Sequence, residues 1–137
     1  MRSAIIIVLM TVACGSAAAD WIKVAELGAG SIFVDPATIR RDGNVAAMGT
    51  LYHLKTPVLS KTNGQPYASQ KLQSEYDCKD EQWRVITSSW HSKNMGEGKM
   101  VEYLADARKW ENIPRESGVK LLWELACENK WPRLTRY

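Results

Sequence analysis

A pair of cysteines behind an export signal constrains this chain more than any other feature of its sequence. The chain begins with the short positive segment Met1-Arg2-Ser3, continues through the apolar run 4–13 and reaches three alanines that end at Ala19. This order is typical of a secretory signal peptide cleaved after Ala19, because the apolar run is shorter than the roughly 20 residues that a membrane-spanning helix needs. Exported chains fold in an oxidising compartment, where Cys78 and Cys127 form an even pair. We therefore predict a Cys78–Cys127 disulfide.

The disulfide is favoured over a redox-active pair. A redox pair usually has the C-x-x-C spacing and a cluster of His or Lys residues nearby, which Cys78 and Cys127 lack. Closing a loop of about fifty residues would restrict the unfolded chain by roughly 4 kcal/mol in the entropic model. That is a large share of the stability of a small domain, so we expect the bond to be structural.

A second processing route involves Cys14. The tetrapeptide Thr11-Val12-Ala13-Cys14 is similar to a bacterial lipobox, in which the cysteine is acylated and becomes the new N-terminus. Thr11 stands where such boxes usually carry Leu, and the signal-peptide pattern fits better. We expect a soluble periplasmic or secreted product, with lipid anchoring through Cys14 as the alternative.

The remaining chain is predicted to be one domain. A chain of 137 residues is long enough for one modest core, and residues 20–137 contain no repeat or low-complexity segment. We expect a core from 21 to 127 and a basic, aromatic tail from 128 to 137. The formal net charge of +3 loses one unit when Arg2 is removed. This weak surplus gives no argument for nucleic acid as a partner.

The pattern of apolar residues predicts strands first and a helix last. Residues 68–78 alternate between polar and apolar, which indicates a half-buried strand, and a polar turn at 79–82 leads to its partner at 83–91. Pro36 is expected to stop a strand, because proline cannot donate to a ladder. Further strands are expected at 21–26, 31–34, 45–55 and 99–104, with a short turn or strand at 37–40, a tight turn at 41–44, and a loop of about a dozen residues at 56–66.

The last predicted element is a helix that Glu116 or Ser117 caps. Its apolar residues recur at helical spacing up to Cys127. The fold class is therefore α+β, an antiparallel sheet of about five to six strands in hairpins with a C-terminal α-helix packed on it. The apolar stripe consists of Leu121, Leu122, Leu125 and Ala126.

No group of residues carries a recognisable catalytic or metal-binding pattern. His53 and His91 are far apart and lack the spaced partners of a zinc site. There is no G-x-S-x-G, and Ser88-Ser89 lies inside a predicted strand. The segment 95–100, MGEGKM, lacks the spacing of a phosphate loop and is better explained as a hairpin turn. We expect no metal, no cofactor and no enzymatic activity.

The tryptophans divide into two groups. Five of the six lie in or near predicted elements and are expected to pack in the core. Trp131 lies in the tail among basic residues, where an aromatic side chain suits a partner-binding patch, although a frayed tail is the commoner explanation. The candidate patch consists of Lys130, Trp131, Arg133 and Arg136.

The motifs, in their order, resemble the surface-adhesin protein E family from about Trp21 to Cys127. They are the segment 32–44 (IFVDPATIRRDGN), the segment 74–84 (SEYDCKDEQWR), the segment 94–101 (NMGEGKMV), Trp110 and a last helix ending at Cys127. The resemblance implies an exported proteobacterial domain with a bent antiparallel sheet, packed against a helix and tied by a disulfide. It also implies a location in the periplasm or at the outer membrane and cell surface.

The function that the resemblance implies is adhesin-like binding of a protein or extracellular-matrix partner, without catalysis. The loop 56–66 and the tail are the expected contact surfaces. The alternatives are a periplasmic structural or accessory envelope protein, and an enzyme whose pocket the sequence does not reveal. Association with the outer membrane and a homodimer through a sheet edge are further expectations, since an open sheet must protect its edges.

Overall fold

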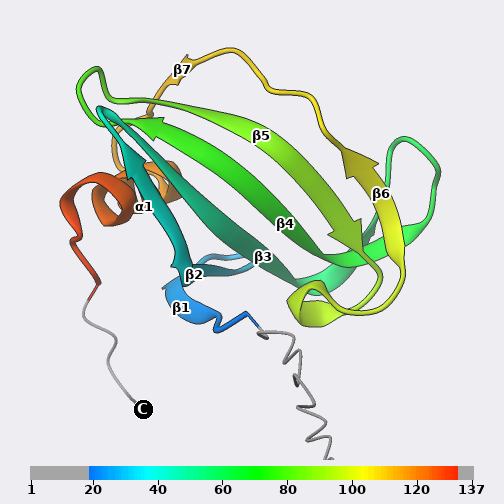
Figure 1. Ribbon diagram of the computed structural model, residues 1–137. Helices are drawn as coiled ribbons and strands as arrows, with labels where there is room; N and C mark the ends of the chain where they lie inside the picture. Colours follow the sequence, from blue (N-terminus) through cyan, green and yellow to red (C-terminus); the bar gives the residue numbers. More distant parts are fainter. Residues whose placement is uncertain (1–18, 133–137) are drawn as a thin grey trace, which may run out of the picture.

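The computed structural model describes residues 19–132, which form one antiparallel sheet with a helix against one end of it (Figure 1). Six strands pair in sequence order, and a short seventh strand, β7, pairs with the outer side of β5. The predicted α+β class is confirmed, with one strand more than expected. The elements are β1 (Ile22–Glu26), β2 (Gly30–Asp42), β3 (Val45–Leu59), β4 (Pro66–Asp77), β5 (Gln82–His91), the 3₁₀ turn η1 (Asn94–Gly96), β6 (Met100–Leu104), β7 (Glu111–Asn112) and α1 (Gly118–Glu128).

β2 continues through Pro36, so the prediction that this proline ends the strand was wrong. The ladder with β3 shifts register between Asp35 and Arg40, and Pro36 lies in this irregular stretch, where no ladder N–H is required. The Asp35 carboxylate accepts a hydrogen bond from the Ala37 N–H at 3.0 Å. The Thr38 hydroxyl accepts one from the Gly49 N–H at 2.8 Å. Thr38 therefore reconnects the bulged strand to β3.

The loop between β3 and β4 is shorter than the predicted 56–66. Leu59 pairs with Pro66 and Val58 with Tyr67, which leaves only residues 60–65 outside the strands. The ladder shifts register between His53 and Val58, and such an irregularity bends a strand. The far end of the hairpin therefore continues beyond the bend as paired strand.

The core lies between α1 and the sheet. The N-terminus of α1 is capped as predicted by Ser117, whose hydroxyl accepts a hydrogen bond from the Lys120 N–H at 3.2 Å. The predicted disulfide joins Cys78, just after β4, to Cys127 in α1. The buried residues of α1 pack against β1 to β4 in a single cluster. Its members are Val24, Ile32, Val34, Ala46, Met48, Tyr76, Leu122, Trp123, Leu125 and Ala126.

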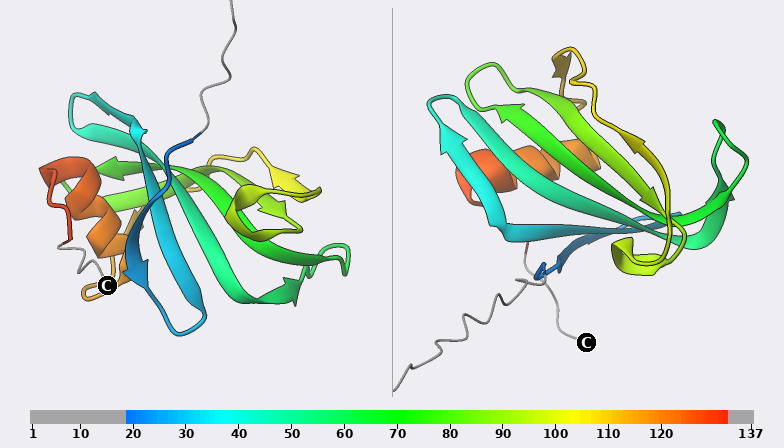
Figure 2. Two further views of the ribbon diagram at one scale, coloured as in Figure 1. Left: turned by 90° about the horizontal axis from the view of Figure 1, so that it is seen from below. Right: turned by 45° about the vertical axis from the view of Figure 1, so that its right-hand side comes forward.

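Only one of the tryptophans predicted for the core is a buried member of it. Trp123 is buried and its indole N–H donates to the Asp77 carbonyl at 2.9 Å, and Trp83 packs partly against the cluster. Trp21, Trp90 and Trp110 are half-buried and lie outside that cluster. α1 covers only one end of the sheet (Figure 2), so Trp90, at the other end of β5, has no second layer over it. Trp110 lies in the connector before β7, where its ring contacts the Arg84 guanidinium at 4.5 Å.

Candidate functional site

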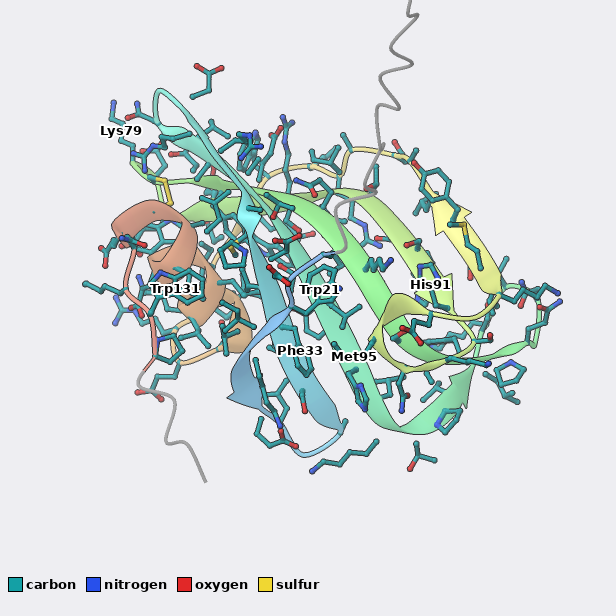
Figure 3. The ribbon with its side chains drawn as sticks, turned by 60° about the horizontal axis from the view of Figure 1, so that its bottom comes forward. Trp21, Phe33, Lys79, His91, Met95 and Trp131 are labelled. Atoms are coloured by element: carbon teal, nitrogen blue, oxygen red, sulfur yellow. A yellow bond between two sulfur atoms is a disulfide. The ribbon has the colours of Figure 1, made fainter. Side chains whose placement is uncertain are left out.

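The predicted patch in the tail is only partly described. The Lys130 ammonium pairs with the Glu128 carboxylate, which raises the pKa of Lys130. The Trp131 indole N–H donates to the Asn129 side chain at 2.9 Å, and Figure 3 shows Trp131 beside α1, far from β6. Arg133, Arg136 and Cys14 lie outside the described residues, so the tail patch and lipid anchoring stay predictions.

The second predicted surface, the β3–β4 loop, forms one wall of a groove. This groove, which we call the hairpin groove, has a volume of about 320 Å³. The elements that line it, the far end of the β3–β4 hairpin and β6, lie at the end of the sheet away from α1 (Figure 2). One wall comes from the far end of the β3–β4 hairpin, the other from β5, β6 and the connector after β6. The lining residues are Val58, Leu59, Ser60, Lys61, Thr62, Tyr67, Trp90, Glu102, Leu104 and Arg108.

Hydrogen bonds join the two walls and fix their relative position. The Glu102 carboxylate accepts from the Ser60 hydroxyl at 2.9 Å and from the Thr62 hydroxyl at 2.8 Å. The Asn63 side-chain amide donates to the Val101 carbonyl at 2.9 Å. Three residues of one loop are therefore attached to one strand about forty positions later in the chain. A groove formed in this way exists before any ligand arrives, and preorganisation lowers the cost of binding.

The hairpin groove lies among exposed apolar side chains. Leu59 is 63% exposed, Val58 47% and Leu104 41%. Met100 and Tyr103 on β6 are exposed as well. Single exposed apolar residues are ordinary, but a cluster of them is typical of an interaction surface.

The acidic and basic side chains at the groove differ in whether they already have partners within the protein. Both oxygens of Glu102 already accept hydrogen bonds from the protein itself. Lys61 and Arg108 are exposed, and within residues 19–132 neither forms an ion pair. The groove therefore presents free cationic donors and an engaged carboxylate.

Comparison with known proteins identifies the family. A family model for surface-adhesin protein E matches residues 21–128. The chain belongs to the surface-adhesin protein E family. The resemblance drawn from the sequence motifs is thereby confirmed. No curated protein matches the sequence of this family member.

Solved structures of Haemophilus influenzae protein E share the fold of this family member. One is 9% identical in sequence with a TM-score of 0.61, and the alignment covers 78% of this chain and 84% of that chain. A second crystal form is 10% identical with a TM-score of 0.59, covering 72% and 80%. Protein E from a non-typeable strain is 10% identical with a TM-score of 0.58, covering 80% and 76%. At such low identity the likeness shows the fold alone.

The opposite face of this surface-adhesin protein E family member carries a buried polar cluster. The Ser89 hydroxyl lies 2.8 Å from the His91 Nε2, and both residues are buried. Burial lowers the pKa of His91, and the nearby Lys71 ammonium lowers it further. The Ser69 hydroxyl donates to the Lys93 carbonyl at 2.6 Å and accepts from the Gly96 N–H at 2.8 Å. The two hydrogen bonds of Ser69 attach η1 to the sheet, and Ser89 and His91 are buried beside them.

A second, wider hollow of about 750 Å³ lies on this face, between the start of the described chain and η1. Trp21, Lys71 and Met95 line it, and Figure 3 shows Trp21 before β1 and Met95 in η1. Its wall includes Ala19, the first described residue, so the described residues alone do not define its boundary. We therefore do not treat this hollow as a candidate site.

No three His, Cys, Asp or Glu side chains between residues 19 and 132 gather in a way that would hold a metal ion. In the same part of the chain, no helix is both long enough and apolar enough to cross a membrane.

Sequence reasoning found the hairpin wall of the groove and missed the other wall. Trp90 was expected in the core, and Leu104 and Arg108 were not singled out. A strand was expected at 99–104, but β6 meets the hairpin only because the sheet curves, and no local pattern in this sequence indicates that contact. A basic residue just after a short strand rich in apolar residues was the one available signal.

Proposed function

We propose that this chain is an exported envelope protein that binds other proteins, an adhesin-like module without enzymatic activity. The observation that carries the proposal is the preformed hairpin groove among exposed apolar residues. Membership of the surface-adhesin protein E family supports it.

The test is binding of the purified, oxidised protein to plates coated with extracellular-matrix proteins. We expect saturable binding that is lost after reduction, alkylation and unfolding, because the groove exists only in the folded chain. Plates coated with serum albumin serve as the control surface. Binding that never saturates, or that the unfolded protein reproduces, would remove the proposal.

We also propose that the protein lies on the cell surface, as the family description suggests. The alternative is a periplasmic structural or accessory role. Protease treatment of intact cells should remove a surface protein, while a periplasmic protein would be spared until the outer membrane is opened. The same fractionation tests outer-membrane association and anchoring, because an acylated Cys14 changes the mass of the mature N-terminus and cleavage after Ala19 leaves Asp20 first.

A further inference from the structure

We infer that the hairpin groove binds an extended acidic segment of a partner protein, one that places a carboxylate beside an aromatic or aliphatic side chain. The inference rests on the proposed function and names the chemistry of the partner at that same groove.

The apolar part of the groove selects one large side chain of the partner. Trp90 and Tyr67 are half-buried and line the groove, and the exposed Leu104 and Val58 line it with them. The volume of about 320 Å³ is at the small end of the range of roughly 300–1,000 Å³ for ligand pockets. A single aromatic or aliphatic anchor suits a pocket of this size, and such anchors carry most of the binding energy of protein interfaces.

The charged part of the groove selects a carboxylate. Arg108 has a guanidinium that matches a carboxylate in a two-bond geometry, and Lys61 adds a second cation on the facing wall. Glu102 is the one acidic residue that lines the groove. Its two oxygens accept hydroxyl hydrogen bonds from Ser60 and Thr62, and among residues 19–132 it forms no ion pair with Lys61 or Arg108. Lys61 and Arg108 can therefore donate hydrogen bonds to a carboxylate of a partner.

The position of β6 favours an extended partner. β6 pairs only with β5 among the described strands, and its Val101 carbonyl is occupied by Asn63. The other outward backbone groups of such an edge strand are free to pair with an added segment. A peptide lying along β6 brings its alternate side chains into the groove beside it.

A protein segment fits the lining better than a fatty acid does. Lys61 and Arg108 line the groove, and an acyl chain passing them would remove their hydration water without replacing its hydrogen bonds. The backbone and polar side chains of a peptide can bond to such groups. An acyl ligand is therefore the outcome that the test below must separate.

The experiment uses the oxidised protein and three fluorescein-labelled decapeptides, with binding followed by fluorescence anisotropy. The first peptide carries two Glu-Phe pairs spaced by Gly and Ser, the second has Lys in place of Glu, and the third has Ser in place of Phe. We expect saturable binding of the first peptide, at least about tenfold weaker binding of the other two, and weaker binding at high salt because charge pairing at a surface is screened.

Variants of the protein locate the site. Arg108→Glu and Leu104→Ser should each weaken binding of the first peptide at least about tenfold. Matched controls are Lys79→Glu, at the α1 end of the sheet (Figure 3), and Leu27→Ser, where the leucine is 42% exposed against 41% for Leu104. Both controls should leave the affinity unchanged. All four residues are exposed, so far-ultraviolet circular dichroism should show unaltered folds.

Several outcomes would overturn the inference. The first is equal affinity for the lysine peptide, and the second is a loss of affinity in the controls as large as in the groove variants. The third is a fatty-acid site: the first peptide does not bind, while oleate, used as the fatty-acid probe, binds and Leu104→Ser removes its binding. If Arg108→Glu and Leu104→Ser bind matrix-coated plates with the affinity of the unaltered protein, the inference about the groove is overturned and the proposed function stands. If the unaltered protein does not bind matrix-coated plates but binds the first peptide through the groove, matrix proteins are rejected as partners and the inference about the groove is supported.

Discussion

At Gly30 the start of β2 lies so close to β3 that a side chain has no room. A Cβ added there would lie 2.0 Å from the carbonyl oxygen of His53, and this oxygen belongs to backbone that cannot rotate away. We predict that Gly30→Ala lowers the free energy of unfolding by about 1–3 kcal/mol, the usual cost of overpacking. Urea unfolding followed by tryptophan fluorescence measures it.

The control for Gly30→Ala is two residues earlier. A Cβ at Gly28 would meet nothing within 4 Å, so Gly28→Ala should change the free energy of unfolding by no more than about 0.5 kcal/mol. Equal effects of the two substitutions would mean that the close approach of β2 to β3 is absent in solution.

The fold alters the titration of His91. Burial lowers its pKa and the Lys71 charge lowers it further. The unfolded chain therefore takes up the proton first as pH falls, and the protein should lose stability once the pH drops below about 6.5, the ordinary pKa of histidine. Nuclear magnetic resonance of the His91 ring should give a midpoint below that value.

Lys71→Met separates the two causes of the His91 shift. This substitution removes the charge and keeps much of the length, so the pKa of His91 should rise. It should remain below about 6.5, because burial still opposes the charged form. A His91 pKa that Lys71→Met leaves unchanged would show that the two side chains do not interact.

At the scale of elements, the end of the β3–β4 hairpin is held to β6 largely by Glu102. Its carboxylate accepts from Ser60 and Thr62, and the Ser60 hydroxyl accepts in turn from the Thr62 N–H at 3.2 Å. We predict that Glu102→Ala speeds amide hydrogen exchange at residues 60–65, because the loop opens locally without global unfolding. Exchange monitored residue by residue measures it.

Glu97→Ala is the matched control, because Glu97 is exposed in the turn between η1 and β6 and its carboxylate has no ion-pair partner among residues 19–132. Exchange at 60–65 should not respond to it. If Glu102→Ala leaves the loop amides as protected as before, the walls of the hairpin groove are held by other contacts.

How far the elements could be predicted follows from which interactions are local. The strand 68–78, the turn after it and the capped helix each have a period or cap written in consecutive residues, and each lies close to where it was predicted. The extension of β2 past Pro36 depends on the Thr38 contact with Gly49, eleven positions away. A proline in a bulge and a proline at a strand end look alike in sequence, so the boundary was missed.

At the scale of the whole molecule, the two ends of the sheet differ in how they are stabilised. The end where β4 finishes and α1 packs has an apolar core and a disulfide. The end that forms the hairpin groove has hydrogen bonds between a loop and an edge strand. The first end was predictable, because export, a cysteine pair and an apolar helical stripe all indicate it. The second arises from sheet curvature, so only half of the candidate site could be predicted.

The Cys78–Cys127 disulfide should therefore matter for the stability of the whole domain and little for the groove. The bond spans 49 positions and joins the end of β4 to α1. We predict that the double variant Cys78→Ser, Cys127→Ser lowers the free energy of unfolding by about 2–4 kcal/mol, mainly by freeing the unfolded chain. Denaturant unfolding measures it.

Where the variant remains folded, it should bind a groove ligand with unchanged affinity, because the elements that line the groove lie at the other end of the sheet. Mass spectrometry without reductant provides the check: free thiols at both Cys78 and Cys127 in the exported protein would show that the bond does not form, and the predicted loss would then be absent.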